Sequence, residues 1–161
     1  MIALFCGILL TATVSASSDI AEVSASWIHD GDTFRATVLN RAVVDCRLWG
    51  IDAPELDQPW GKVSRSALIA LLIKRKLTVT KVSESYGRMV VKADRKGVDV
   101  ALFMLKMGLA WADRRYSPPE DYIKAEAEAR AEKRGLWSEK KPVPPWEWRS
   151  RKKDTEPKEK E

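Results

Sequence analysis

Short runs of alternating apolar and polar residues dominate the first half of the chain and restrict the folds it can adopt. Between residues 22 and 96 most segments have the two-residue period of a half-buried β-strand. In one of them Val44, Cys46 and Leu48 share a face, because side chains alternate across a strand. The strands expected from this pattern are a first one beginning near residue 22 and others at residues 33–39, 42–51, 77–82 and 88–93.

Helical spacing replaces the strand pattern at three places. Within residues 61–76, Val63, Leu68 and Leu72 recur on one helical face, which predicts a helix that packs on the core. Two further helices are expected at 100–107 and 117–134, each followed by a glycine of the kind that ends helices. Five short strands, interrupted by one helix and followed by two, predict an α+β fold. A small five-stranded β-barrel of the oligonucleotide-binding type fits this order of elements.

The N-terminus has the pattern of an export signal. An apolar run over residues 2–14 leads into the small residues Val14-Ser15-Ala16, as in a secretory signal peptide that is cleaved after residue 16. We therefore expect a signal peptide at 1–16, a linker at 17–22, and a secreted or periplasmic protein. A buried first helix or strand is the alternative. Cleavage would remove Cys6 and leave Cys46 as a small buried residue within a strand.

Charge and composition exclude several kinds of site. The chain has 28 Lys and Arg against 23 Asp and Glu, a net charge of +5 that favours an anionic partner such as nucleic acid or an acidic membrane. One histidine and two cysteines are too few for a two-histidine phosphodiesterase site or a thiolate zinc site within one chain. No apolar run reaches the roughly 20 residues that a membrane-spanning helix needs.

Three short segments hold a set of charged residues that could act together. They are Asp30-Gly31-Asp32-Thr33, Arg47 to Glu55, and Tyr86-Gly87-Arg88. Carboxylates at the mouth of a barrel suit a hard cation, which takes oxygen ligands, and arginines suit a phosphate because a guanidinium binds two oxygens at once. A further carboxylate can orient a water. The set is sufficient for metal-assisted cleavage of a phosphodiester without a histidine, although each segment alone also fits an ordinary turn, loop or hairpin.

In their order and spacing these segments resemble the staphylococcal nuclease (thermonuclease) family. Gly108-Leu109-Ala110 and Gly135-Leu136-Trp137 extend the resemblance, which covers residues 23–138. It implies a five-stranded barrel of the oligonucleotide-binding type with three helices, in agreement with the pattern of elements.

The resemblance also implies a calcium site. Asp32 and Asp52 match the calcium ligands of the family, and Ala53 stands where the family offers a backbone carbonyl to the ion. Glu55 matches the residue that is usually proposed as general base or as organiser of the attacking water. Because few protein ligands are present, water would complete the coordination, and we expect weak affinity, in the range of about 10⁻⁴–10⁻³ M.

Four further residues are implied to bind the substrate. Arg47 and Arg88 match the two arginines that clamp the phosphate, and Arg88 is also placed near the leaving oxygen. Tyr116 aligns with a tyrosine that packs on the bound nucleotide. Arg114 stands where a second tyrosine is expected, so stacking is replaced there by a side chain that could contact phosphate.

The function implied is calcium-dependent endonucleolytic hydrolysis of DNA and RNA, with little sequence specificity and with 3′-phosphate products. A non-catalytic nucleic-acid-binding module on the same barrel is the first alternative, and a secreted basic structural or partner-binding domain is the second. We expect a monomer that needs no obligate protein partner and, after cleavage of the signal, no membrane.

The C-terminal segment has a different composition from the rest. From residue 139 it is rich in proline and then dense in charges of both signs, so we expect a disordered tail over residues 139–161. Within it, Trp146 and Trp148 have three interpretations: they stack on nucleic acid, they anchor a helix, or they lie exposed in the tail.

Overall fold

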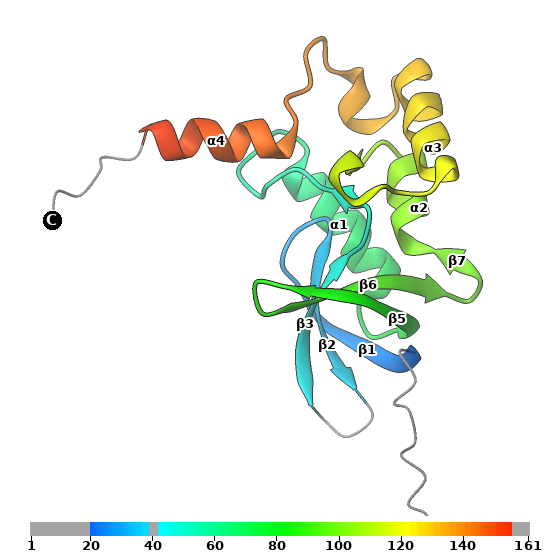
Figure 1. The fold of residues 1–161 in the computed structure, drawn as a ribbon. Helices are drawn as coiled ribbons and strands as arrows, with labels where there is room; N and C mark the ends of the chain where they lie inside the picture. The colour runs from blue at the N-terminus through cyan, green and yellow to red at the C-terminus, as the bar shows by residue number, and fades with distance from the viewer. Residues whose placement is uncertain (1–19, 39–41, 156–161) are drawn as a thin grey trace, which may run out of the picture.

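A closed five-stranded barrel forms the centre of the molecule in the computed structural model, which describes residues 20–38 and 42–155 (Figure 1). Buried and more exposed side chains alternate along much of the barrel, as the sequence pattern predicts, whereas residues 81–84 are exposed throughout. The predicted signal peptide at residues 1–16 lies outside the described residues. The barrel strands are β1 (Ile20–Ile28), β2 (Thr33–Val38), β3 (Val43–Leu48), β5 (Lys76–Ser85) and β6 (Arg88–Arg95).

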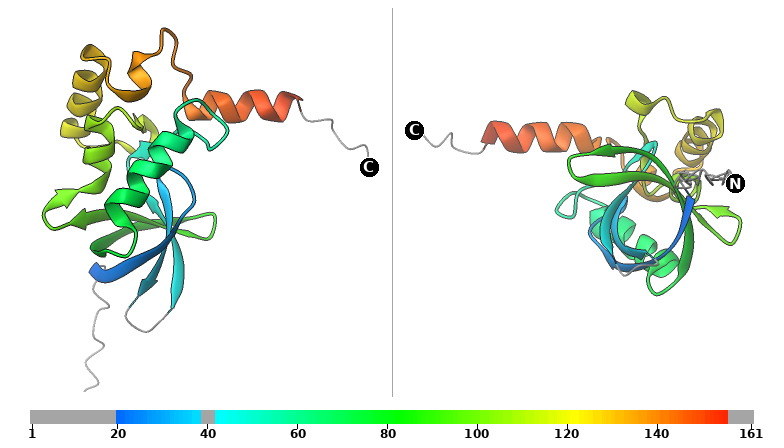
Figure 2. Two further views of the ribbon diagram at one scale, coloured as in Figure 1. Left: turned by 180° about the vertical axis from the view of Figure 1, so that it is seen from behind. Right: turned by 60° about the horizontal axis from the view of Figure 1, so that its bottom comes forward.

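Barrel closure depends on one parallel strand pair. The strands follow the order β3-β2-β1-β5-β6, with the short β7 (Val98–Asp99) beyond β6. The first and last barrel strands, β3 and β6, then pair in parallel, with Arg47 opposite Val90. The right-hand view of Figure 2 shows the strands curving around this closed ring. The α+β fold with an oligonucleotide-binding-type barrel, predicted from the sequence, is confirmed.

Helices cover one side and one end of the barrel. The helix α1 (Gly61–Leu72) follows the short β4 (Ile51–Asp52) and is fixed to β1, because Arg65 Nε donates to the Ile28 carbonyl at 2.9 Å. The helices α2 (Val100–Lys106) and α3 (Glu120–Ala131) pack on each other, within the predicted helical ranges. Within residues 20–38 and 42–155 no helix has both the length and the apolar character needed to cross a membrane.

The chain turns sharply where the sequence predicted one continuous strand over residues 42–51. The strand β3 ends at Leu48, and Gly50 adopts a φ of 77°, a left-handed conformation that glycine tolerates best. After this turn β4 pairs with β8 (Trp111–Ala112), with Asp52 opposite Trp111. The turn therefore brings Asp52 back toward Arg47.

The ends of the domain differ from the sequence prediction. The strand β1 begins at Ile20, inside the predicted linker at 17–22, because it pairs with β5 from its first residue. The prediction of a disordered tail from residue 139 is wrong for the helix α4 (Pro145–Thr155), which extends sideways from the body in Figure 1. Tryptophans and charged residues of α4 contact the rest of the domain, and these contacts cannot be predicted from the composition of the segment.

Cys46 is expected to be chemically inert in the folded protein. It is a free cysteine that is fully buried in the barrel core, and burial raises the pKa of its thiol to about 12. Because the thiolate is the reactive form, Cys46 should not react with a disulfide reagent at pH 8 until the protein is unfolded. Thiol titration of a Cys6→Ser variant, with and without urea, measures this. Rapid reaction of the native protein would contradict the burial.

Candidate active site

The turn between β1 and β2 presents the first aspartate of the site. Asp30 Oδ1 accepts hydrogen bonds from the backbone N–H groups of Asp32 at 3.0 Å and Thr33 at 2.7 Å, which closes the turn. A Cβ atom at Gly31 would lie 1.9 Å from Ser64 Oγ, so only glycine fits here against α1. The turn therefore fixes the backbone that carries Asp32.

Asp32 is buried among hydrogen-bond donors. Its Oδ1 accepts from Thr33 Oγ at 2.8 Å and from Arg47 Nη1 at 2.6 Å, and its Oδ2 accepts from the backbone N–H of Ala53 at 2.8 Å. Burial raises the pKa of Asp32 to about 8, whereas Arg47 and the Ala53 N–H lower it. The carboxylate is therefore held in one orientation in a place where negative charge is costly.

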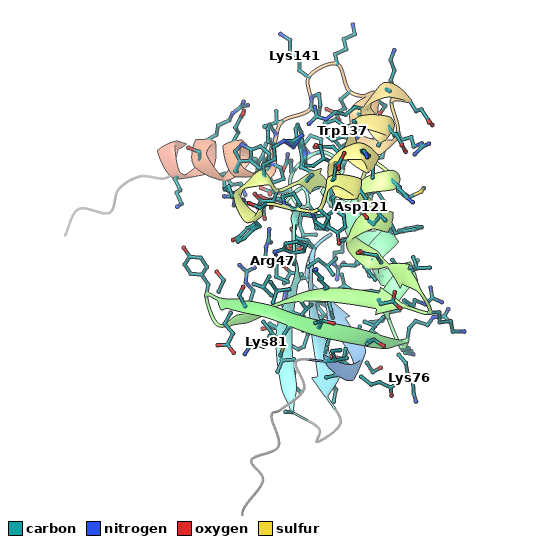
Figure 3. The ribbon with its side chains drawn as sticks, turned by 45° about the vertical axis from the view of Figure 1, so that its right-hand side comes forward. Arg47, Lys76, Lys81, Asp121, Trp137 and Lys141 are labelled. Atoms are coloured by element: carbon teal, nitrogen blue, oxygen red, sulfur yellow. The ribbon has the colours of Figure 1, made fainter. Side chains whose placement is uncertain are left out.

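Arg47 links the two aspartates. Its Nη1 contacts Asp32, and its Nη2 lies 3.0 Å from Oδ1 of Asp52, which is fully buried. Burial lowers the pKa of Arg47, but the two carboxylates outweigh this effect and raise the pKa above its ordinary value. Two carboxylates that share one guanidinium must lie close together. Figure 3 shows Arg47 at the end of the barrel nearest to the C-terminal elements.

Two more arginines reach Asp52, and the sequence did not indicate either. Arg115 Nη2 lies 3.2 Å and Arg149 Nη2 lies 2.7 Å from Asp52 Oδ2. Arg149 also places Nη1 2.6 Å from Glu55 Oε1. Nothing in the local sequence marks Arg115 among its neighbouring arginine and aspartate, and Arg149 lies in the segment that was expected to be disordered. The cluster of Asp32, Arg47, Asp52, Glu55, Arg115 and Arg149 is named here the acidic cluster site.

Glu55 lies in the loop between β4 and α1. Its side chain is one-third exposed (33%), unlike those of the two aspartates. Its backbone N–H donates to Gln58 Oε1 at 3.1 Å, and a Cβ atom at Gly61 would lie 1.8 Å from the Glu55 carbonyl oxygen. The loop is therefore tightly folded against the start of α1 and offers this carboxylate to solvent.

Arg88 is placed by strand register. It begins β6, which pairs with β3 so that Arg47 is opposite Val90. Because side chains alternate along a strand, Arg88 and Val90 share a face, and this is the face of Arg47. Arg88 is half-buried, and among the residues that the structure describes it forms no ion pair.

The two predicted nucleotide-contacting residues lie next to the acidic cluster site and are not joined to it. Arg114 and Tyr116 belong to the short 3₁₀ helix η1 (Arg114–Tyr116), which follows β8. The Arg114 guanidinium lies 3.3 Å from the buried Glu126 carboxylate, and Tyr116 is 42% exposed. The residue between them, Arg115, makes the contact with Asp52 instead.

The donor set fits a hard cation with few protein ligands. Over residues 20–38 and 42–155, no three His, Cys, Asp or Glu side chains are grouped so that they could hold a metal ion together. Two carboxylates are present, Asp32 and Asp52, with the backbone carbonyl of Ala53 next in the chain. Oxygen ligands of this kind suit calcium or magnesium when water completes the coordination.

Comparison with known proteins agrees with the resemblance found in the sequence. A family model described as staphylococcal nuclease homologue matches residues 45–139. A protein of Escherichia coli O157:H7 named as an uncharacterized endonuclease is 40% identical over 127 residues, which make up 78% of this chain and 82% of that protein. A Haemophilus influenzae protein of the same name is 32% identical over 127 residues, 78% of this chain and 71% of its own. The staphylococcal-like nuclease CAN1 of Arabidopsis thaliana is 40% identical over 107 residues, 66% of this chain but 33% of the plant protein.

The closed five-stranded barrel places the chain in the class of oligonucleotide-binding-type folds. Within that class, the chain belongs to the staphylococcal nuclease homologue family. The resemblance drawn from the three charged segments is thereby confirmed.

Proposed function

We propose that this chain is a calcium-dependent endonuclease that hydrolyses DNA and RNA with little sequence specificity and leaves 3′-phosphates. Family membership and relatives named as endonucleases support nuclease activity. The observation that carries the proposal is the convergence of two buried aspartates on one guanidinium, beside the partly exposed carboxylate of Glu55. Carboxylates, arginines and a solvent-accessible acid are the groups that phosphodiester hydrolysis needs.

Each residue of the proposal has a separate task. Asp32, Asp52 and the Ala53 carbonyl would hold the cation, which when bound neutralises charge on the phosphate. Glu55 is accessible enough to orient a water or accept its proton. Arg47 and Arg88, on one face of adjacent strands, would bind phosphate oxygens, since guanidinium groups match their geometry. Contacts of this kind carry no sequence information, so we expect salt-sensitive cleavage with little base preference.

Calcium removal is expected to abolish hydrolysis. Heat-denatured DNA and a single-stranded RNA should be degraded with millimolar calcium and left intact with EGTA. Restoring free calcium should restore the rate. End-labelling with and without phosphatase would identify 3′-phosphates among the products. Undiminished activity in EGTA would contradict the role of the metal.

We extend the proposal to export and oligomeric state. An exported monomer would meet the high calcium concentration that a weak site requires. N-terminal sequencing of the secreted or periplasmic form should begin at residue 17, and light scattering should give the mass of one chain. Recovery of the protein with residues 1–16 intact would contradict the signal peptide.

A further inference from the structure

The helix α4 is held against the site by contacts at several points. The Trp146 ring packs edge-on against the buried Trp111, with ring centroids 5.5 Å apart. Trp148 Nε1 donates to Asp57 Oδ1 at 3.3 Å, and Lys152 forms an ion pair with the same carboxylate. These contacts fix α4 across the loop that carries Glu55.

The segment that leads into α4 is also attached. The side chain of Gln58, which is buried, donates from Nε2 to the Val143 carbonyl at 2.6 Å. Gln58 also holds the Glu55 backbone through its Oε1. The side chain of Gln58 therefore binds both the loop that carries Glu55 and the segment that leads into α4.

Arg149 is the residue of α4 that enters the acidic cluster site. It approaches both Asp52 oxygens, with Nη1 3.2 Å from Oδ1 and Nη2 2.7 Å from Oδ2, and it binds Glu55 at 2.6 Å. Arg47 also donates to Asp52 Oδ1, at 3.0 Å, and Arg115 donates to Oδ2, at 3.2 Å. Every oxygen of Asp52 is thus already bound by guanidinium groups, so a cation could use these oxygens only if a guanidinium withdrew.

The contacts of Arg149 and its place in the chain identify it as the group that would withdraw. Four carboxylates, Asp32, Asp52, Glu55 and Asp113, lie with three guanidinium groups in one connected network. Of the three guanidinium groups, that of Arg149 contacts both oxygens of Asp52 and also Glu55. Arg149 is also the arginine carried by a terminal helix outside the barrel, and α4 lies beyond the residues that the family model matches, 45–139.

We propose that α4 is an intramolecular strap whose Arg149 occupies the acidic cluster site in place of the divalent cation, so that docking of the strap and binding of the cation compete. The inference rests on the proposed function for the cation site itself. The docked strap keeps the carboxylates of Asp52 and Glu55 paired with Arg149 at low cation concentration. Binding of the cation displaces Arg149 and releases the Glu55 carboxylate from its ion pair.

Calcium titration of the intact protein tests the competition. Isothermal calorimetry in chelator-treated buffer should give an Arg149→Gln variant about tenfold tighter calcium binding than the parent, within the usual range of coupling between sites. An Arg151→Gln variant is the matched control, because it removes the same charge from α4 and its guanidinium pairs with Glu147 of the same helix at 3.4 Å. Its calcium affinity should equal that of the parent.

A variant that weakens the docking of α4 without altering Arg149 gives a second test of the competition. Asp57→Asn removes the ion pair with Lys152 and weakens the contact with Trp148, and it should also tighten calcium binding, though less than Arg149→Gln. Hydrogen exchange supplies a readout that does not depend on activity. Amides of residues 145–155 in the parent should exchange faster with saturating calcium than with EGTA.

The outcomes separate the two proposals. Equal calcium affinity of the parent and Arg149→Gln, or unchanged exchange of α4 on calcium binding, overturns the strap and leaves the calcium site standing. Failure of both proteins to bind calcium overturns the proposed site and the competition for it together.

Discussion

Replacement of Glu55 with glutamine is expected to lower the rate of DNA hydrolysis by about 10²–10⁴, the usual contribution of a general base. The variant keeps the size of the side chain and an oxygen that can accept from Arg149, whose Nη1 lies 2.6 Å from Glu55 Oε1 in the parent. The fold and the cation ligands should therefore be preserved. The measurement is the rate at saturating calcium, with calcium binding measured on the same samples.

Glu84→Gln is a suitable control for this loss. Glu84 is an exposed carboxylate paired with Lys81 at 2.6 Å on β5, so it undergoes the same chemical change outside the site. Its rate should match that of the parent. If Glu55→Gln is also as active as the parent, Glu55 does not activate the water.

Replacement of Arg47 with methionine is expected to lower the free energy of unfolding by about 3 kcal/mol, since it leaves two buried carboxylates without their shared cation. This is the lower end of the range for a broken buried ion pair, because Arg115 and Arg149 still contact Asp52. Urea denaturation in EGTA measures the loss. An Arg35→Met variant should lose less than about 1 kcal/mol, because its pair with Asp45 is exposed.

The loss in Arg47→Met should depend on pH. The pKa of Asp32 is raised to about 8 in the folded protein, so the folded protein holds the Asp32 proton more tightly than the unfolded chain does. The contribution of Asp32 to the free energy of unfolding therefore declines as pH rises from about 4 through 8. Arg47 interacts most strongly with the ionised Asp32 carboxylate, so it stabilises the folded protein most at high pH. The destabilisation should therefore be larger at pH 9 than at pH 5, and a larger loss at pH 5 would contradict the burial of Asp32 against Arg47.

The barrel and the charged residues on it could be predicted because the signals are local. Strand alternation places Cys46 and Arg47 on opposite faces of one strand, and in the structure Cys46 is buried in the core while Arg47 is partly buried on the other face. The segments around Asp32 and Asp52 each carry their own turn chemistry, so their geometry does not depend on distant contacts. The turn at Gly50 could not be predicted, because a single glycine inside an apolar run is compatible with a continuous strand.

The contribution of α4 could not be predicted, because it depends on long-range contacts. Residues 145–155 are dense in charge and have no continuous apolar face, which is the composition of a disordered tail. Their docking depends on Trp111 and Asp57, which are distant in sequence from Trp146 and Trp148. Of the interpretations of these tryptophans, the helix anchor agrees with the structure.

A crystal structure grown with calcium, or with a lanthanide as an anomalous probe, tests the central claim most directly. We predict a cation between the carboxylates of Asp32 and Asp52, with the Ala53 carbonyl among its ligands and Arg149 withdrawn from Asp52. A cation bound elsewhere, with Arg47 and Arg149 still closing the acidic cluster site, would contradict the account.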